Sequence, residues 1–180
     1  MNENAFFETF RKDGISGIQL LLAEGISINT ATAMGRTLLH IAVAERQSEH
    51  IPELLALGAD SNAQDVWGYT PLHEAAFWGD ETAAEHLLAA GARPDMQVQR
   101  GLHEGAWAFH IAKRWKRSAV LARLEAQTPP DSMRLQGRRK ISRAGFSVML
   151  DLSVSKLPQQ ALQDFRTRYS EPLKHAAEWP

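Results

Sequence analysis

The fold of this chain is decided by residues 68–91, which read GYTPLHEAAFWGDETAAEHLLAAG. Thr70 can cap a first helix through its hydroxyl, and Pro71 suits the first helical turn, where its missing N–H costs nothing. Gly91 can end a second helix in a left-handed conformation. The stretch therefore predicts two short helices in succession.

The same pattern recurs along the chain with a period of 33 residues. Glycines stand at 25, 58 and 91, and the stretch GRTLLHIA at 35–42 returns as GYTPLHEA at 68–75. A further copy, GAWAFHIA at 105–112, begins 37 residues after Gly68, so four extra residues lie around Gln97 to Glu104. Trp107 and Ala108 replace the threonine and proline of this opening, so the start of that helix lacks a capping hydroxyl. Self-similarity at this period indicates stacked structural repeats.

This pattern resembles the ankyrin repeat, with its threonine, proline, leucine, histidine opening and its leucine-rich second helix. The resemblance covers about residues 4–127 and implies an all-α solenoid with β-hairpin fingers. Two apolar-periodic segments, 5–10 and 15–22, predict the helices of an N-terminal capping repeat without a hairpin. We therefore predict that residues 1–127 form an ankyrin solenoid of this cap and three repeats, the third irregular.

The chain beyond the repeats is predicted to be different. Residues 128–132, TPPDS, end the helical pattern and predict a linker. Residues 133–180 are predicted to form a C-terminal extension that caps the solenoid. In it, alternating apolar residues over 146–154 predict a strand, and helices are predicted to begin at Pro158 and near Pro172. This extension is too small for an independent enzyme core.

Composition excludes several classes of protein. The chain has no cysteine, which excludes a disulfide scaffold and a thiol nucleophile. The first residues lack a signal pattern and no apolar run reaches bilayer length, so we expect a soluble, cytoplasmic protein. Residues 1–95 hold 14 Asp and Glu against 5 Lys and Arg, whereas residues 96–180 hold 7 against 15. This bipolar charge argues against a plain polyanion binder, and we interpret the basic residues over 134–143 as a solvated face.

The histidines do not predict catalysis. His40, His73 and His110 fall at the position where the resemblance implies a buried imidazole that bridges neighbouring backbones. No histidine pair has a third ligand at zinc spacing, no glycine-rich loop follows a strand, and no serine lies on a nucleophile elbow. His73 and Glu74 point about 100° apart on a helix and cannot easily share a substrate atom. We predict no catalytic residue, no cofactor and no metal site, and therefore a protein that is not an enzyme.

The resemblance also implies where a partner would bind. Ankyrin partners usually meet the residues beside the finger glycine and those after the buried alanines of each first helix. In this chain those positions are Met34, Arg36, Ala44 and Glu45 in the first repeat, Val66, Trp67, Tyr69, Phe77 and Trp78 in the second, and His103, Glu104, Arg114 and Trp115 in the third. All five positions of the second repeat are apolar or aromatic, and Trp, Tyr and Arg commonly anchor interfaces.

The predicted function is binding to another protein through the concave aromatic face, with Trp67, Tyr69, Trp78 and Trp115 as central anchors. The specific form we predict is a monomeric bacterial immunity protein that inhibits a cognate toxin. The alternative is a secreted or host-directed effector or adaptor, or an activity in the extension with the repeats finding its target. The aromatic residues could instead pack on one another, or the extension could fold into the groove. Nucleic-acid binding and a small-ligand pocket are disfavoured.

Overall fold

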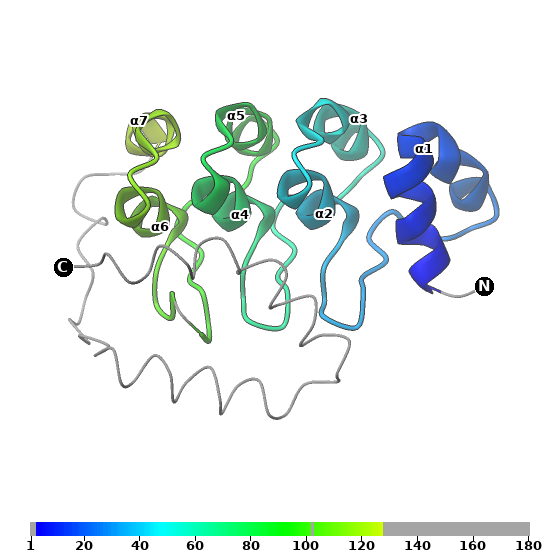
Figure 1. The fold of residues 1–180 in the computed structure, drawn as a ribbon, viewed down its shortest axis with the longest axis horizontal. Coiled ribbons are helices and arrows are strands. Elements are labelled where there is room, and N and C mark those ends of the chain that lie inside the picture. Colours follow the sequence, from blue (N-terminus) through cyan, green and yellow to red (C-terminus); the bar gives the residue numbers. More distant parts are fainter. Residues whose placement is uncertain (1–2, 102, 128–180) are drawn as a thin grey trace. The chain divides into compact units, whose positions relative to one another are not determined.

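The computed structural model describes residues 3–101 and 103–127, which form successive helical pairs (Figure 1). The chain begins with one long, kinked helix and continues with shorter helices. These elements are α1 (Glu3–Ala23), α2 (Leu38–Ala44), the 3-10 turn η1 (Ser48–His50), α3 (Ile51–Ala56), α4 (Pro71–Trp78), α5 (Glu81–Ala89), α6 (Ala108–Arg114) and α7 (Ser118–Gln127).

The helices form two rows. Figure 1 shows α2, α4 and α6 side by side in an inner row, next to the loops that project from the helices, and α3, α5 and α7 in an outer row. Within the inner row α4 contacts both α2 and α6, and in the outer row α5 contacts both α3 and α7. The predicted ankyrin solenoid is therefore confirmed for the described residues.

The N-terminal cap consists of two helical segments, as predicted. Gly14 interrupts α1 with φ 63° and ψ −148°, a conformation that glycine adopts without steric cost. A side chain at this point would also meet His50, because an added Cβ would lie 2.9 Å from its Nε2. The kink turns the apolar residues of both segments into the core, where Phe6, Phe10 and Ile18 are fully buried.

Local capping defines the limits of α4 and α5. The hydroxyl of Thr70 accepts a hydrogen bond from the N–H of His73 at 3.4 Å, at the N-terminus of α4. Gly79 ends α4 in a left-handed conformation, and the carboxylate of Asp80 accepts from the N–H of Ala83 at 2.9 Å to open α5. Two residues are therefore enough to reverse the chain between inner and outer helix.

The 33-residue period places small and large side chains in register in the core. Leu54 and Leu87 of the outer row are fully buried, and Leu21 is 7% exposed in the cap. The inner row carries fully buried alanines at equivalent positions, Ala42, Ala75 and Ala112. Small side chains at these positions allow the inner helices to pack closely, while leucines fill the space between the rows.

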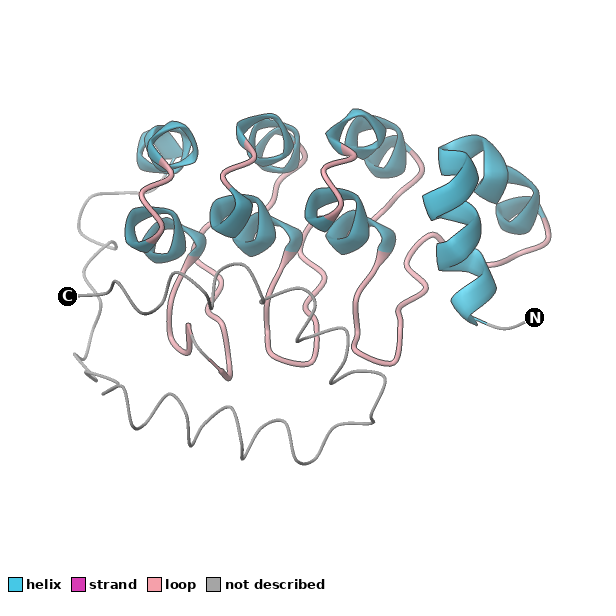
Figure 2. Ribbon diagram, in the orientation of Figure 1, coloured by secondary structure: helices cyan, strands magenta, loops and turns pink. Residues whose placement is uncertain are grey.

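The predicted β-hairpin fingers are not supported: the loops at these positions are hydrogen-bonded turns, and none of the described residues forms a β-strand (Figure 2). In the second finger the N–H of Asp65 donates to the carbonyl of Tyr69 at 2.9 Å. The return bond of a ladder is missing, because the N–H of Tyr69 donates to the carboxylate of Asp65, also at 2.9 Å. A side chain thus replaces the backbone acceptor, and the turn does not extend into strands.

The predicted linker at 128–132 and extension at 133–180 lie outside the described residues, together with the predicted strand and helices of that extension. The division into solenoid, linker and extension remains a prediction.

Candidate functional site

The motif histidines join neighbouring repeats through the backbone. Nδ1 of His73 accepts a hydrogen bond from the N–H of Thr70 at 3.0 Å, so its proton lies on Nε2. That nitrogen donates to the carbonyl of Met96 in the next finger at 3.1 Å. His40 repeats the arrangement one repeat earlier, accepting from Thr37 at 3.2 Å and donating to the carbonyl of Tyr69 at 3.0 Å. The predicted structural role is confirmed for both imidazoles.

The third repeat begins its helix without a threonine. The N–H of Trp107 donates to Nδ1 of His110 at 3.1 Å, as in the other two repeats. Trp107 has the extended backbone of an N-cap residue, with φ −90° and ψ 165°. The histidine bond at the start of α6 is therefore kept without the threonine, and α6 and α7 form a helical pair like those before them.

An aromatic cluster lies where the second and third repeats meet, and we define it as Tyr69, Phe77, Trp78, His103 and Trp115. Phe77 is at its centre, with edge-to-face contacts to the rings of Trp115 at 4.9 Å and Trp78 at 5.0 Å between centroids. Edge-to-face aromatic pairs at these distances contribute beyond the burial of their area. The cluster connects the ends of α4 and α6 with two fingers.

His103 organises the aromatic cluster by two hydrogen bonds. The indole N–H of Trp115 can only donate, so Nε2 of His103 is the acceptor of their 3.2 Å bond. Nδ1 therefore carries the proton and donates to the hydroxyl oxygen of Tyr69 at 2.8 Å. Burial, followed by electrostatic interactions with Arg114 and His73, lowers the pKa of His103 from 6.5 to about 3. The imidazole is thus neutral and locks the rings of Tyr69 and Trp115 in fixed positions.

The four extra residues of the third finger place His103 in this cluster. The finger is closed between Val98 and Ala106, whose N–H···O bond of 3.0 Å matches the Asp65–Tyr69 bond of the second finger. Seven residues lie between Val98 and Ala106, against three in the second finger. The additional loop turns back on itself, with the N–H of Ala106 donating to the carbonyl of His103 at 2.8 Å. The predicted insertion is confirmed, and the structure shows that it brings His103 inward.

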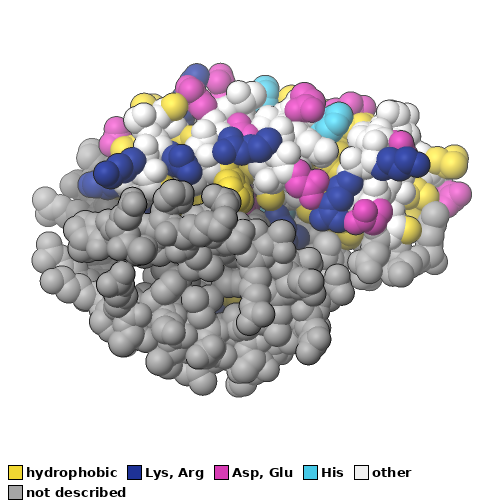
Figure 3. All heavy atoms as spheres, viewed as in Figure 1, with side chains coloured by type: hydrophobic (Ala, Val, Ile, Leu, Met, Phe, Trp, Pro, Cys, Tyr) yellow, Lys and Arg dark blue, Asp and Glu magenta, His cyan; other side chains and the backbone are white. Residues whose placement is uncertain are grey.

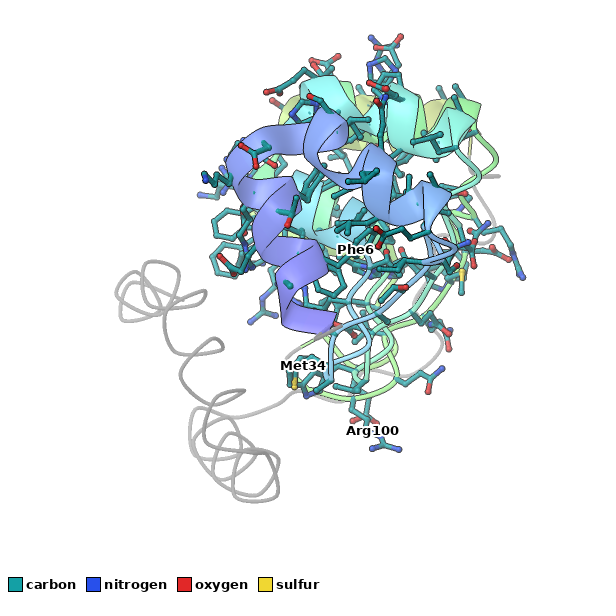
Figure 4. All side chains as sticks on the ribbon, turned by 90° about the vertical axis from the view of Figure 1, so that its right-hand side faces the viewer. Phe6, Met34 and Arg100 are labelled. Atoms are coloured by element: carbon teal, nitrogen blue, oxygen red, sulfur yellow. The ribbon has the colours of Figure 1, made fainter. Side chains whose placement is uncertain are left out.

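Neighbouring fingers are hydrogen-bonded in series at their tips. The N–H of Val66 donates to the carbonyl of Met34 at 3.0 Å, and the carbonyl of Trp67 accepts from Gln99 at 2.8 Å and Arg100 at 3.1 Å. Figure 4 shows Met34 and Arg100 at this finger end, away from the helices that enclose Phe6. The tips therefore form one continuous edge rather than independent loops.

The structure divides the residues predicted to contact a partner into three groups. Met34, Tyr69, Phe77 and His103 are buried, Arg36, Trp67, Trp78 and Trp115 are half-buried, and Glu45, Val66, Glu104 and Arg114 are exposed. Packing of aromatic residues on one another therefore accounts for Tyr69 and Phe77, which were predicted to face solvent. Phe77 packs edge-to-face on two of the half-buried tryptophans, Trp78 and Trp115. Contact of any of these residues with a partner remains a prediction.

Sequence reasoning missed Arg46 and Lys116, although the period could have revealed them. Arg46 and Lys116 occupy the positions equivalent to Gly79, and all three have positive φ, of 61°, 54° and 74°. An L-residue in this left-handed conformation costs about 1 kcal/mol, which glycine avoids. The guanidinium of Arg46 lies 5.8 Å from the centroid of the Trp78 ring and donates to the carbonyl of Trp78 at 2.9 Å. A charged side chain thus stands where the repeat would favour glycine.

Acidification should destabilise the solenoid, because two of its histidines are buried in the neutral form. Burial lowers the pKa of His73 from 6.5 to about 4, against weaker opposing effects of backbone hydrogen bonds. In this pH range the unfolded state therefore binds a proton at this imidazole and the folded state does not, so stability is lost as the pH falls from 6.5 toward 4. We expect His73 to account for about 2 kcal/mol between pH 6.5 and 4.5, with His103 acting in the same direction. Denaturant titrations at a series of pH values measure this loss.

The control for this prediction is His73→Gln, which keeps a polar side chain of similar length but binds no proton. Its free energy of unfolding should depend less steeply on pH than that of the wild type. An identical slope in the two proteins would contradict a neutral, buried His73.

The described residues hold no group of three or more His, Cys, Asp or Glu side chains arranged to bind a metal ion. Within the same residues, no helix is long and apolar enough to cross a bilayer. The described residues form a two-row helical solenoid with an aromatic cluster between its second and third repeats, which is the architecture of a helical repeat protein.

A comparison with protein families identifies which repeat this is. Residues 9–98 match the family model of ankyrin repeats in three copies. The chain belongs to the ankyrin-repeat family. Ankyrin repeats bind other proteins, and as a family they are binding modules rather than catalytic domains.

Known relatives share part of their length with this chain. It is 31% identical over 104 residues to the inactive serine/threonine-protein kinase TEX14 of Bos taurus, covering 58% of this chain and 7% of that protein. It is 29% identical over 143 residues to protein phosphatase 1 regulatory subunit 12A of Mus musculus, covering 79% and 13%. A putative ankyrin repeat-containing protein of Treponema pallidum (strain Nichols) is 36% identical over 100 residues, covering 55% and 34%. The chain therefore spans about a third or less of the length of each of these relatives.

Proposed function

We propose that this protein binds another protein through the surface formed by Trp67, Trp78 and Trp115. The observation that carries the proposal is the packing that holds Trp78 and Trp115 in place. Phe77 packs edge-to-face on both Trp78 and Trp115, and His103 fixes the indole of Trp115 by a hydrogen bond of 3.2 Å. Half-buried tryptophans on a rigid base lose little side-chain entropy on binding, which is the property of interface anchors.

Exposed residues around the tryptophans supply the rim of this surface. Val66 is 43% exposed at the finger tip, and Glu104 and Arg114 are exposed on the third repeat. Glu45 is exposed at the other side, where it accepts a hydrogen bond from Arg11 of the cap at 2.7 Å. An apolar and aromatic centre with charges at its edge is the usual anatomy of a protein interface.

The narrower form of this proposal is inhibition of a cognate toxin by a monomer of this chain in the cytoplasm. A host-directed effector or adaptor is the alternative, and the relatives, which include a regulatory subunit, agree with regulation by binding. An inhibitor must form a stoichiometric complex that abolishes the activity of its partner, whereas an adaptor leaves that activity intact. Assaying the captured partner with and without this protein separates the two.

Removing two anchors should abolish capture of the partner. We expect a Trp67→Ala/Trp78→Ala variant to recover at least about tenfold less partner than the wild type in affinity capture, because single aromatic anchors contribute about 2 kcal/mol or more. The backbone bonds of Trp67 to the third finger do not need its side chain, so the finger edge should persist. Quantitative mass spectrometry of the captured proteins measures the difference.

Leu57→Ala provides the matched control, since Leu57 is a 42% exposed apolar residue just after α3, in the outer row. Its recovery of the partner should equal that of the wild type. Circular dichroism and thermal unfolding establish that the variants are folded at the temperature of capture. Equal recovery by the tryptophan variant and the wild type would overturn the proposed surface.

A further inference from the structure

The ends of the inner helices carry positive charges that form no ion pair within residues 3–101 and 103–127. We define the cationic rim as Arg46, Lys113, Lys116 and Arg117, which lie at or just after the C-termini of α2 and α6. None of the four forms an ion pair with an acidic side chain of the described residues, whereas Arg11, Arg93 and Arg123 all do. Pairing is thus present elsewhere on this solenoid and absent at the rim.

Two of these charges are fixed next to each other on the end of α4. Arg46 donates to the carbonyl of Trp78 at 2.9 Å, and Nε of Arg117 donates to the carbonyl of Phe77 at 3.1 Å. The two guanidinium groups therefore bind consecutive carbonyls at the negative end of a helix. Each guanidinium has five N–H donors, so most of its donors are not used by these bonds.

The carboxylates next to Arg46 and to the end of α4 in the chain have other partners: Glu45, next to Arg46, binds Arg11, and Asp80 caps α5. Asp80 follows Gly79 directly, but its side chain is turned into the N-terminus of α5. There it accepts hydrogen bonds from the N–H of Ala83 at 2.9 Å and from the hydroxyl of Ser48. The carboxylate of Asp80 thus caps α5 and does not neutralise the cationic rim.

Backbone conformation at the rim also opposes local preference. Arg46 and Lys116 are the non-glycine residues with positive φ among those that the structure describes. Gly79 shows that the same turn is made by glycine in the repeat between them. A non-glycine residue in a left-handed turn that favours glycine indicates that its side chain has a function. Here the retained side chains are long and positively charged.

The rim borders the tryptophan surface. In Figure 1 the turns after α2, α4 and α6 lie on the near side of the helices, and Figure 3, drawn from that side, shows Lys and Arg side chains with apolar side chains between them. Arg46 stacks on the ring of Trp78, and Lys116 follows Trp115 directly in the chain. A ligand on the tryptophans would therefore lie within reach of these charges.

We propose that the cationic rim receives an acidic segment of the protein partner, which places carboxylates on Arg46, Lys116 and their neighbours while apolar groups cover the tryptophans. This inference rests on the proposed function and adds the chemistry of the partner. The rest of the solenoid favours a short acidic peptide over a long polyanion, because residues 1–127 carry 16 Asp and Glu against 11 Lys and Arg. Outside the rim, the net negative charge of residues 1–127 would repel nucleic acid or an anionic membrane.

The test uses the full chain and a defined probe, a fluorescein-labelled twelve-residue peptide of Asp, Glu and Ser with one central Phe. Fluorescence anisotropy at low salt should show binding that is weakened at least about tenfold in Arg46→Gln/Lys116→Gln, since each lost charge pair weakens charged interfaces. Arg123→Gln is the matched control, because Arg123 is paired with Glu81 and Glu85 in the outer row. This variant should bind the peptide as the wild type does.

A second variant separates binding from folding. Lys116→Gly removes the charge and relieves the left-handed backbone, so its midpoint of thermal unfolding should rise while its peptide affinity falls. A loss of binding in this variant cannot be attributed to unfolding. A lower midpoint, or unchanged affinity, would contradict the assignment of Lys116 to the rim.

Three outcomes would overturn the proposal that the partner supplies an acidic segment. The acidic peptide would bind wild type and Arg46→Gln/Lys116→Gln equally. A peptide with Lys in place of Asp and Glu would bind the wild type as well as the acidic peptide does, or single-stranded DNA or phosphatidylserine vesicles would bind it more tightly. Self-association that depends on Arg46 would instead identify a second copy of this chain as the occupant. The proposed function has its own test: it is wrong if the Trp67→Ala/Trp78→Ala variant still captures the partner. If that variant loses the partner while Arg46→Gln/Lys116→Gln retains it, the tryptophan surface is supported and the proposal of an acidic segment is wrong.

Discussion

The His73→Ala variant is expected to lose about 3 to 5 kcal/mol of unfolding free energy, a large part of the stability of a small domain. The imidazole is 1% exposed and bonds the N–H of Thr70 and the carbonyl of Met96. Alanine would leave both groups buried without these bonds, and a cavity would open between two repeats. Denaturant unfolding followed by circular dichroism measures the change at neutral pH, where His73 is not protonated.

His86→Ala is the control for this substitution. His86 is half-buried in the last turn of α5, and its replacement should change stability by about 0.5 kcal/mol or less. If the two alanine variants unfolded at the same denaturant concentration, His73 would not connect the repeats. Because the bond to Met96 spans two repeats, its loss should also broaden the unfolding transition as the repeats uncouple.

A second large effect is expected at the tip of the second finger, where Gly68→Ala should cost about 3 kcal/mol. Gly68 has φ +86°, and an added Cβ would lie 2.7 Å from the backbone nitrogen of Gln99. That nitrogen donates to the carbonyl of Trp67, so the clash falls on a bond that joins two fingers. A backbone atom cannot turn away as a flexible side chain can, and the third finger must shift. Thermal and denaturant unfolding measure the loss.

Gly58→Ala separates the clash from the backbone strain. Gly58 has φ +87°, nearly the value at Gly68, but an added Cβ would meet nothing within 4 Å. Its substitution should therefore cost only the strain of a left-handed alanine, about 1 kcal/mol. If Gly58→Ala lost as much unfolding free energy as Gly68→Ala, the clash with the third finger would not be the reason for the glycine at position 68.

Much of the fold follows from local chemistry that sequence alone displays. Thr70 and Pro71 predict the start of α4, and the 33-residue step predicts the buried motif histidines. The prediction of β-hairpin fingers was wrong in detail, because Asp65 uses its carboxylate to bind the N–H of Tyr69. A motif specifies the position of a turn, but competition between a side chain and a backbone acceptor decides whether strands form.

The sequence predicts which positions form the candidate surface, but not how exposed their side chains are. The repeat motif predicts Trp67, Trp78 and Trp115 as contact positions, and the structure places them half-buried. Register also selected Tyr69 and Phe77, which are buried because the rings pack against each other across two repeats. Periodicity assigns each residue a place within its own repeat, but it carries no information about what the next repeat places beside it.

The class of this protein follows from its sequence, since capping residues, small residues and leucines at a fixed step act within one repeat and its immediate neighbour. The character of the aromatic surface depends instead on contacts between repeats. The irregular third finger brings His103 beneath Trp115, and Arg46 of the first repeat reaches the ring of Trp78 in the second. These contacts join residues 12 and 32 positions apart, at places where the repeats differ from one another. A repeating pattern predicts what the repeats share, and the features proposed here for recognition arise from their differences.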